Sequence, residues 1–150
     1  MKAILFIGIQ ASGKSTFYAQ TFANTHIRIN LDMLKTRHRE RRLLETCLDI
    51  KQPFVVDNTN PTVADRDRYI PLAKYYKFQI TGYYFPPNLA DSLQRNQQRT
   101  GKQRIPEQGI RATHKRLVPP TYAEGFDQLY QVCIAPGGKF IVQKWADESR

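Results

Sequence analysis

The segment Gly8-Ile9-Gln10-Ala11-Ser12-Gly13-Lys14-Ser15-Thr16 decides the fold of this chain. It fits the pattern G-x-x-x-x-G-K-[ST], which is typical of a loop that binds phosphate groups. Residues 3–7 before it form a continuous apolar run, as expected for a buried strand, and residues 14–23 read as a helix. The alternative is a glycine-containing turn that fits the pattern by chance. A strand, this loop and a helix in succession argue against that alternative.

The residue types of the loop match the chemistry of phosphate binding. Glycine lets the backbone turn tightly, so that successive N–H groups surround phosphate oxygens at the positive end of the following helix. We expect Lys14 to reach the β- and γ-phosphates of ATP, and the Ser15 hydroxyl to ligate Mg²⁺. The loop residues predicted to bind ATP are Gly8, Gln10, Ala11, Ser12, Gly13, Lys14, Ser15 and Thr16.

Apolar runs and helical patterns alternate along the rest of the chain. Further strands are predicted at 26–30, 54–56 and 78–85, and helices at 32–49, 63–75, 89–100 and 106–117. This alternation indicates a parallel α/β sheet. The segments 130–134 and 139–145 flank Pro136-Gly137-Gly138 and predict a β-hairpin. We therefore predict an α/β fold of three layers, α/β/α, with a mainly parallel central sheet, a small lid and a C-terminal β-hairpin. The residues 1–150 are predicted to form a single domain.

Composition narrows the functional classes. The net charge of +10 over 150 residues predicts attraction to polyanions such as nucleic acid, nucleotides or an anionic membrane surface. The two cysteines, Cys47 and Cys133, lack metal-ligand spacing, which favours a reducing compartment over a disulfide framework or a zinc site. The apolar start of the chain leads straight into the phosphate loop, and no stretch reaches the ~20 apolar residues that span a membrane. We expect a cytoplasmic protein.

Two aspartates lie where an acceptor and a metal would be held. Asp32 directly follows the strand predicted at 26–30, near the sheet edge where ligands of parallel α/β proteins bind, and is a candidate general base or orienting group. An ordinary acid at a helix start is the alternative. Asp57 ends the strand at 54–56 and is a candidate for holding Mg²⁺ or bracing Ser15, the alternative being a helix cap.

Basic residues follow in the predicted lid. Arg95 and Arg99 are four residues apart and therefore share one helix face, ahead of Gly101-Lys102-Gln103-Arg104. Arginines at such a place can neutralise charge that develops on a transferred phosphoryl group. A solvated basic helix face is the alternative.

These pieces, in this order, resemble the kinase domain of the polynucleotide 5′-hydroxyl kinase family. The resemblance extends from the first strand almost to the hairpin. The segments that carry it are Gly8–Thr16, Ile29-Asn30-Leu31-Asp32, Val56-Asp57-Asn58-Thr59-Asn60-Pro61, Arg95-Asn96-Gln97-Gln98-Arg99, Ile105-Pro106 and Pro120-Thr121-Tyr122-Ala123-Glu124-Gly125-Phe126. The resemblance implies a P-loop kinase that uses ATP and Mg²⁺.

The resemblance also implies roles for single residues. Asp32 matches the general base toward the 5′-hydroxyl, and Arg99 matches a lid arginine that contacts ATP phosphates, with Arg95 one turn earlier. Asp57 matches the strand-end acid of the mammalian type. The bacteriophage member carries an arginine three residues after the base, where this chain has Lys35, which keeps the charge but loses the bidentate fork. The residues predicted to contact the acceptor are Asp32, Lys35, Arg37, Asn58 and Thr59.

A dense positive cluster follows Asp32. Its members are Lys35, Arg37, His38, Arg39, Arg41 and Arg42. A nucleic-acid strand whose 5′ end reaches Asp32 would pass its phosphates near them; a solvated helix face is the alternative. The leading prediction is an ATP-dependent kinase for 5′-hydroxyl ends of DNA or RNA, with no membrane and no obligate protein partner. A P-loop kinase for a small metabolite or nucleoside, and a non-catalytic ATP-binding module, are the rivals.

Overall fold

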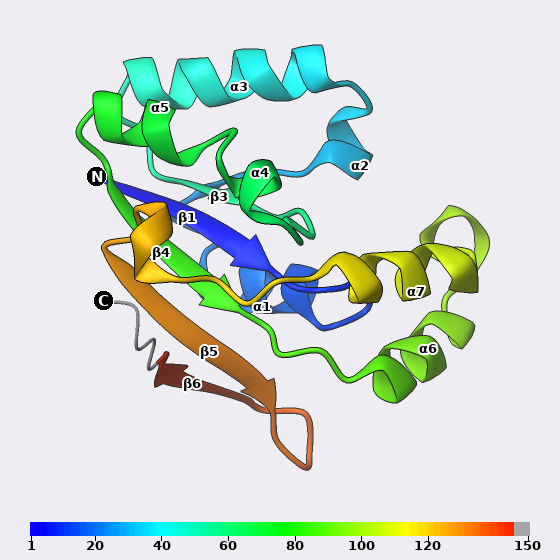
Figure 1. Cartoon of the computed structure of the whole chain (residues 1–150). Helices are drawn as coiled ribbons and strands as arrows, with labels where there is room; N and C mark the ends of the chain where they lie inside the picture. The colour runs from blue at the N-terminus through cyan, green and yellow to red at the C-terminus, as the bar shows by residue number, and fades with distance from the viewer. Residues whose placement is uncertain (146–150) are drawn as a thin grey trace.

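The computed structural model describes residues 1–145 and contains a central sheet of six strands (Figure 1). The strands are β1 (Lys2–Ile7), β2 (Ile27–Ile29), β3 (Phe54–Val56), β4 (Gln79–Tyr84), β5 (Gln128–Ile134) and β6 (Phe140–Lys144). Their order in the sheet is β2-β3-β1-β4-β5-β6. All neighbours pair in parallel except β5 and β6, which form the predicted antiparallel hairpin. The mainly parallel α/β sheet expected from the sequence is confirmed.

Helices cover both faces of the sheet and extend past one of its edges (Figure 1). They are α1 (Lys14–Thr21), α2 (Leu31–Leu34), α3 (Arg37–Asp49), α4 (Val63–Arg66), α5 (Ile70–Tyr75), α6 (Leu89–Gln97) and α7 (Glu107–Arg116). Two short 3₁₀ turns, η1 (Gly101–Gln103) and η2 (Tyr122–Glu124), complete the elements. The pair α6 and α7 with η1 occupies the place of the predicted lid. None of the helices within residues 1–145 is long and apolar enough to cross a membrane.

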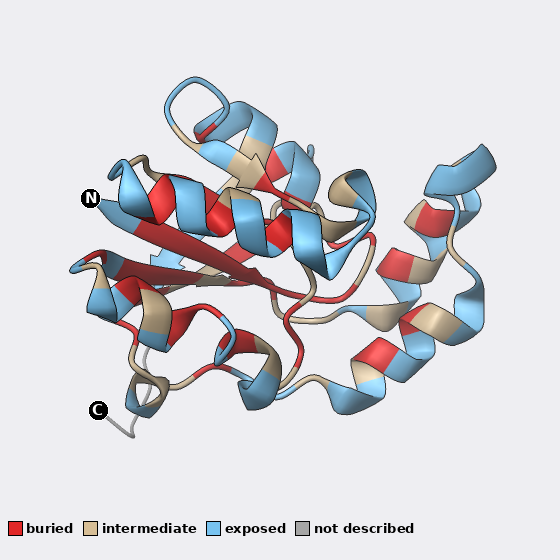
Figure 2. Cartoon of the chain, turned by 90° about the horizontal axis from the view of Figure 1, so that it is seen from above, coloured by how far each residue is buried: buried red, intermediate tan, exposed pale blue. Residues whose placement is uncertain are grey.

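Alternation along β1 divides the core into two clusters, one on each side of the sheet. Ala3, Leu5 and Ile7 pack with residues of α3 and α5, among them Leu44. Ile4 and Phe6 pack on the opposite face against α1. Because residues 3–7 of β1 are buried on both faces of the sheet, this part of the strand is apolar without interruption (Figure 2).

Two helices that were each predicted to be continuous are divided in the structure, so these two predictions are wrong. The helix predicted over 32–49 is divided into α2 and α3, because Lys35 has a left-handed φ of 76° and the Thr36 side chain accepts the Arg39 N–H as a new N-cap. The helix predicted over 63–75 is divided into α4 and α5. Pro71 lies in the first turn of α5 and lacks an N–H, so α4 cannot continue through it.

Candidate active site

Three parallel strands end at the same edge of the sheet and bring the predicted site together. The phosphate loop follows β1, Asp32 lies in α2 directly after β2, and Asp57 follows β3 (Figure 1). In open parallel sheets this edge is where ligands bind.

The phosphate loop has the backbone that its sequence requires. Ala11 and Gly13 adopt left-handed φ values of 58° and 97°, and the Gly8 N–H donates to the Thr59 carbonyl over 3.0 Å. A Cβ at Gly8 would lie 2.9 Å from the Phe85 Cβ, so a side chain does not fit there. Gly13 caps α1 without a side-chain hydrogen bond, and no acidic residue lies in the first turn of that helix. The start of α1 therefore keeps the positive character that suits an anion.

The lid helices hold the loop from outside. Ser92 Oγ and Arg95 Nη1 both donate to the Ala11 carbonyl, over 3.2 and 3.1 Å, and Gln10 Nε2 donates to Thr113 Oγ1 of α7 over 3.0 Å. These contacts turn the Ala11 carbonyl toward α6. Arg95, predicted to bind ATP, thus contacts the backbone of the phosphate loop in this structure.

Lys14 lies at the electrostatic centre of the site. Its Nζ donates to the Ile9 carbonyl over 2.7 Å, and the side chain is buried. Burial lowers the pKa of Lys14 from 10.5 to about 8; the charges of Asp57 and Asp32 oppose this shift, and that of Arg99 adds to it. Two predicted acids and the predicted lid arginine therefore all act on the ammonium of the phosphate loop.

The lowered pKa of Lys14 predicts a pH-dependent affinity for ATP. An ordinary lysine stays charged until the pH nears 10.5, whereas Lys14 loses its proton as the pH rises through about 8. The affinity of the protein for a fluorescent ATP analogue should hold from pH 6.5 to 7.5, and then fall by up to about tenfold per pH unit. The Lys14→Met variant should bind weakly with a flat profile. Constant affinity of the native protein up to pH 10 would contradict this role for Lys14.

Ser15 and Asp57 offer oxygens of the kind that Mg²⁺ prefers. The Ser15 hydroxyl donates to Asp57 Oδ2 over 3.2 Å, and Asp57 is buried at the end of β3. One hydroxyl, one carboxylate and the phosphates of a nucleotide form a donor set that fits Mg²⁺, which usually binds few protein ligands and keeps several waters. A third side chain, Arg28 of β2, contacts both residues and is not among the site residues predicted from the sequence.

Comparisons with known proteins identify the family and the fold of this chain. Residues 33–120 match the family described as AAA domain. The chain belongs to that family.

Two curated relatives align with 86% of this chain. One, from Schizosaccharomyces pombe, is named bifunctional polynucleotide phosphatase/kinase and is 27% identical over 133 residues. The other, from Acanthamoeba polyphaga mimivirus, is named putative bifunctional polynucleotide phosphatase/kinase and is 31% identical over 136 residues. The predicted resemblance to polynucleotide kinases is confirmed, and the chain spans about a third of the length of these relatives, 33% and 32%.

Two solved structures share the fold of this chain. Kti12 of Chaetomium thermophilum, solved in complex with ADP-AlF3, has a TM-score of 0.70 at 13% identity, over 90% of this chain and 92% of that chain. A gluconokinase from Sinorhizobium meliloti 1021 has a TM-score of 0.58 at 18% identity, over 89% and 83% of the two chains. The fold is that of a P-loop kinase with three layers, as predicted.

A polar network places α2 beside the end of β3. The Asn30 side chain donates to the Asp57 carbonyl over 2.6 Å and accepts the Met33 N–H, which caps α2. Asn58 Oδ1 accepts the Leu31 N–H over 2.9 Å. Asparagines at the ends of two neighbouring strands therefore fix the turn that carries Asp32.

Behind Asn58 lies a buried carboxylate that the sequence analysis missed. Asn58 Nδ2 donates to Glu40 Oε2 over 2.8 Å, and the Tyr69 hydroxyl donates to the same oxygen over 3.2 Å. Burial, together with the charge of Glu40, raises the pKa of Tyr69 to about 12, so the phenol stays protonated and keeps donating. Arg37, predicted to bind the acceptor, donates to Glu40 Oε1 over 2.7 Å in this structure.

The remaining predicted residues lie around the polar network of Asn30, Asn58 and Glu40. Asp32 and Lys35 are exposed in α2 and at its C-cap. Thr59 contributes its carbonyl to Gly8, as described above. Thr16 is exposed on α1. Arg99 is half-buried in the lid, where its Nη1 donates to the Gln103 carbonyl over 3.5 Å.

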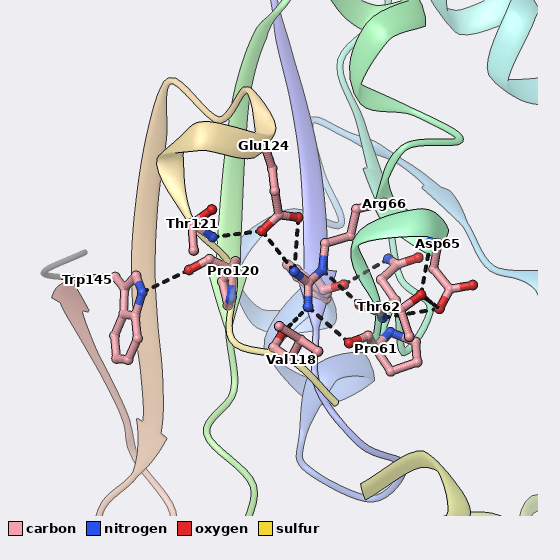
Figure 3. A network of polar contacts seen from close by, with 11 residues as sticks. Pro61, Thr62, Asp65, Arg66, Val118, Pro120, Thr121, Glu124 and Trp145 are labelled. Carbon is pink, nitrogen blue, oxygen red and sulfur yellow. Dashed lines mark hydrogen bonds and ion pairs between the residues drawn. The ribbon is translucent and has the colours of Figure 1, made fainter. Parts of the chain in front are cut away.

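A second missed feature is a buried ion pair that braces the loop after β3 (Figure 3). Arg66 is fully buried, and its Nη1 donates to both carboxylate oxygens of Glu124 over 2.9 and 3.0 Å. The same guanidinium donates to the carbonyls of Asn60, Pro61 and Val118. It therefore joins the 58–61 turn, which contacts the phosphate loop, to the segment before β5.

Proposed function

We propose that this chain transfers the γ-phosphate of ATP to the 5′-hydroxyl end of a DNA or RNA strand. The observation that carries the proposal is that Lys14, Asp32 and Asp57 lie on the segments that follow β1, β2 and β3 at one edge of the sheet. The lid, which carries Arg99, contacts the same phosphate loop through α6. Mere nucleotide binding needs neither Asp32 nor Arg99. Two relatives named as polynucleotide phosphatase/kinases support a polynucleotide acceptor.

Each charged residue has a separate task in the proposed transfer. Lys14 holds the β- and γ-phosphates with its protonated ammonium, and Arg99 neutralises charge on the phosphoryl group from the lid. Asp32 orients the attacking hydroxyl and accepts its proton late, because the transition state of phosphoryl transfer is largely dissociative. Ser15 and Asp57 would hold Mg²⁺, which supplies charge neutralisation at the phosphate oxygens when it is bound.

The exposed position of Asp32 suits the end of a long acceptor. The six basic residues of the 35–42 segment follow it, Lys35 at the C-cap of α2 and the other five along α3, and all six are exposed. Three of them also make local contacts: Arg37 with Glu40 over 2.7 Å, Arg39 Nη1 with the Leu34 carbonyl over 3.2 Å, and Arg41 with Glu45 over 3.8 Å. This surface offers positive charge along the path by which a strand would leave Asp32.

The test is a panel of acceptors with labelled ATP and Mg²⁺. We expect label on 5′-hydroxyl oligonucleotides of DNA or RNA, and none on oligonucleotides that already carry a 5′-phosphate. Nucleoside 3′-phosphates, sugars and other metabolites complete the panel. Lys14→Ala is the control for contaminating kinases. Faster transfer to a free metabolite than to any oligonucleotide would replace the proposal by a small-molecule kinase, which the same fold also supports in a protein named gluconokinase.

The salt dependence of the reaction tests the role of α3. If α3 binds acceptor phosphates, each contact releases counterions, and the apparent affinity for the oligonucleotide should fall steeply between 50 and 200 mM salt, by about tenfold or more. Substituting both Arg39 and Arg42 by glutamine should reduce the slope of this dependence. A flat salt response would count against a polynucleotide acceptor.

A further inference from the structure

Arg28 on β2 contacts both side chains that we assign to Mg²⁺. Its Nε donates to Asp57 Oδ2 over 2.8 Å, and its Nη2 donates to Ser15 Oγ over 2.9 Å. The Ser15 hydroxyl in turn donates to the same Oδ2 of Asp57 over 3.2 Å. The three groups thus form a closed triangle in which one guanidinium contacts both oxygens.

The strand pattern explains why an arginine lies here. Ile29 of β2 is buried in the core beneath α3, so Arg28 points to the opposite face of the sheet, beside Val55 of β3 and toward α1. The side chain of Arg28 is 28% exposed, whereas that of Asp57 is 1% exposed. The guanidinium carbon also lies 5.9 Å from the ring centre of Tyr18 on α1. The Arg28 side chain therefore lies beside solvent and an aromatic ring and can move. The carboxylate of Asp57 is buried and cannot move away.

We propose that Arg28 competes with Mg²⁺ at the phosphate loop and so sets how much Mg²⁺ the protein needs to bind nucleotide. The inference rests on the proposed function, because that function assigns Ser15 and Asp57 to Mg²⁺. A guanidinium and a Mg²⁺ ion that contact the same oxygens are close neighbours of like charge, and their repulsion is poorly screened beside a buried carboxylate. Arginine keeps its charge at every accessible pH, so only a movement of its side chain relieves the repulsion.

The opposite role for Arg28 predicts the opposite result. If Arg28 merely kept Asp57 ionised and Ser15 oriented, its loss would weaken the binding of Mg²⁺. If Arg28 competes, its loss strengthens that binding. The sign of the change therefore separates the two roles.

The experiment measures the Mg²⁺ concentration at which the protein half-saturates with a fluorescent ADP analogue. In Arg28→Gln, whose amide can still donate to Asp57, we expect this concentration to fall by about three- to tenfold. In Arg28→Lys, which keeps the charge but cannot contact both oxygens with one planar group, we expect a smaller fall. Arg68→Gln, an exposed arginine between α4 and α5, removes the same charge and should leave the value unchanged.

Each outcome decides the inference. An unchanged or higher Mg²⁺ requirement in Arg28→Gln overturns it, and circular dichroism confirms that the variant is folded. If that variant does not fold, Arg28→Lys decides alone, because it retains a cation beside Asp57; an unchanged requirement then overturns the inference. Absence of nucleotide binding by the native protein overturns both the inference and the proposed function. Mg²⁺-dependent binding with the expected shifts, but without transfer to oligonucleotides, overturns the proposed function alone.

Discussion

Replacing Asp32 by asparagine should lower the rate of phosphate transfer by about 10²- to 10⁴-fold, the usual contribution of a positioned acid or base. The variant keeps the shape of the side chain but loses the negative charge that orients the hydroxyl and receives its proton. Asp32 is exposed in the first turn of α2, and that turn is fixed by the backbone and side-chain contacts of Asn30 and Asn58. The fold and the phosphate loop should therefore be unaffected. Single-turnover transfer from labelled ATP measures the rate, and fluorescent nucleotide binding measures the affinity, which should change by no more than about twofold.

A matched control lies at the C-terminal end of α3, beyond the basic segment. Asp49→Asn makes the same chemical change at the exposed C-terminal end of α3, about 18 Å from the start of that helix at 1.5 Å per residue. It should transfer phosphate at the native rate. Native-like transfer by Asp32→Asn would remove Asp32 from the mechanism, whichever acceptor the protein uses.

The largest expected loss of stability follows from replacing Glu124 by glutamine. The change leaves the fully buried guanidinium of Arg66 without its carboxylate, and removing one partner of a buried ion pair typically costs about 3–5 kcal/mol. Glu124 Oε2 also accepts the Thr121 N–H over 2.7 Å (Figure 3), and glutamine keeps only one acceptor oxygen to serve both this N–H and Arg66. Urea unfolding followed by circular dichroism measures the free energy of unfolding of the variant and of the native protein.

The chain supplies a control pair with similar chemistry on the surface. Arg111 and Glu107 of α7 also form an ion pair, 2.7 Å apart, but both side chains are more than half exposed. Glu107→Gln should therefore change the free energy of unfolding by less than about 1 kcal/mol. Equal losses from the two variants would show that the burial of the Arg66–Glu124 pair has no energetic consequence.

Replacing both members of the buried pair by apolar residues should not restore stability here. Such exchanges are often neutral or stabilising when the two charged groups contact only each other. Arg66, however, also donates to three backbone carbonyls, those of Asn60, Pro61 and Val118. Without the guanidinium these carbonyls lose their partner in a buried place. The pair thus holds the turn that carries Asn58 and Thr59, and through the Thr59 carbonyl it supports the phosphate loop.

The phosphate loop, the strands and the mainly parallel character of the sheet could be predicted from the sequence, but not the order of the strands. The reason is local: β1 is apolar on both faces, the loop needs glycine at fixed places, and a helix must follow, so neighbouring residues suffice to specify this unit. The Pro136-Gly137-Gly138 turn likewise specified the hairpin of β5 and β6. The positions of Asp32 and Asp57 followed because the ends of parallel strands meet at one edge of the sheet.

The contacts between charged side chains become visible only in the folded structure. Arg66 stands between two acids in a run that resembles an exposed surface, and its partner Glu124 is 58 residues away. Arg28 meets Asp57 across two strands, and Glu40 meets Asn58 and Tyr69 from a helix whose other charged residues are exposed. These pairings depend on strand register and on burial. Burial raises the free-energy cost of a charged side chain, and a partner at the right distance offsets that cost. The local sequence does not indicate these contacts, because the residues involved become neighbours only after the chain has folded.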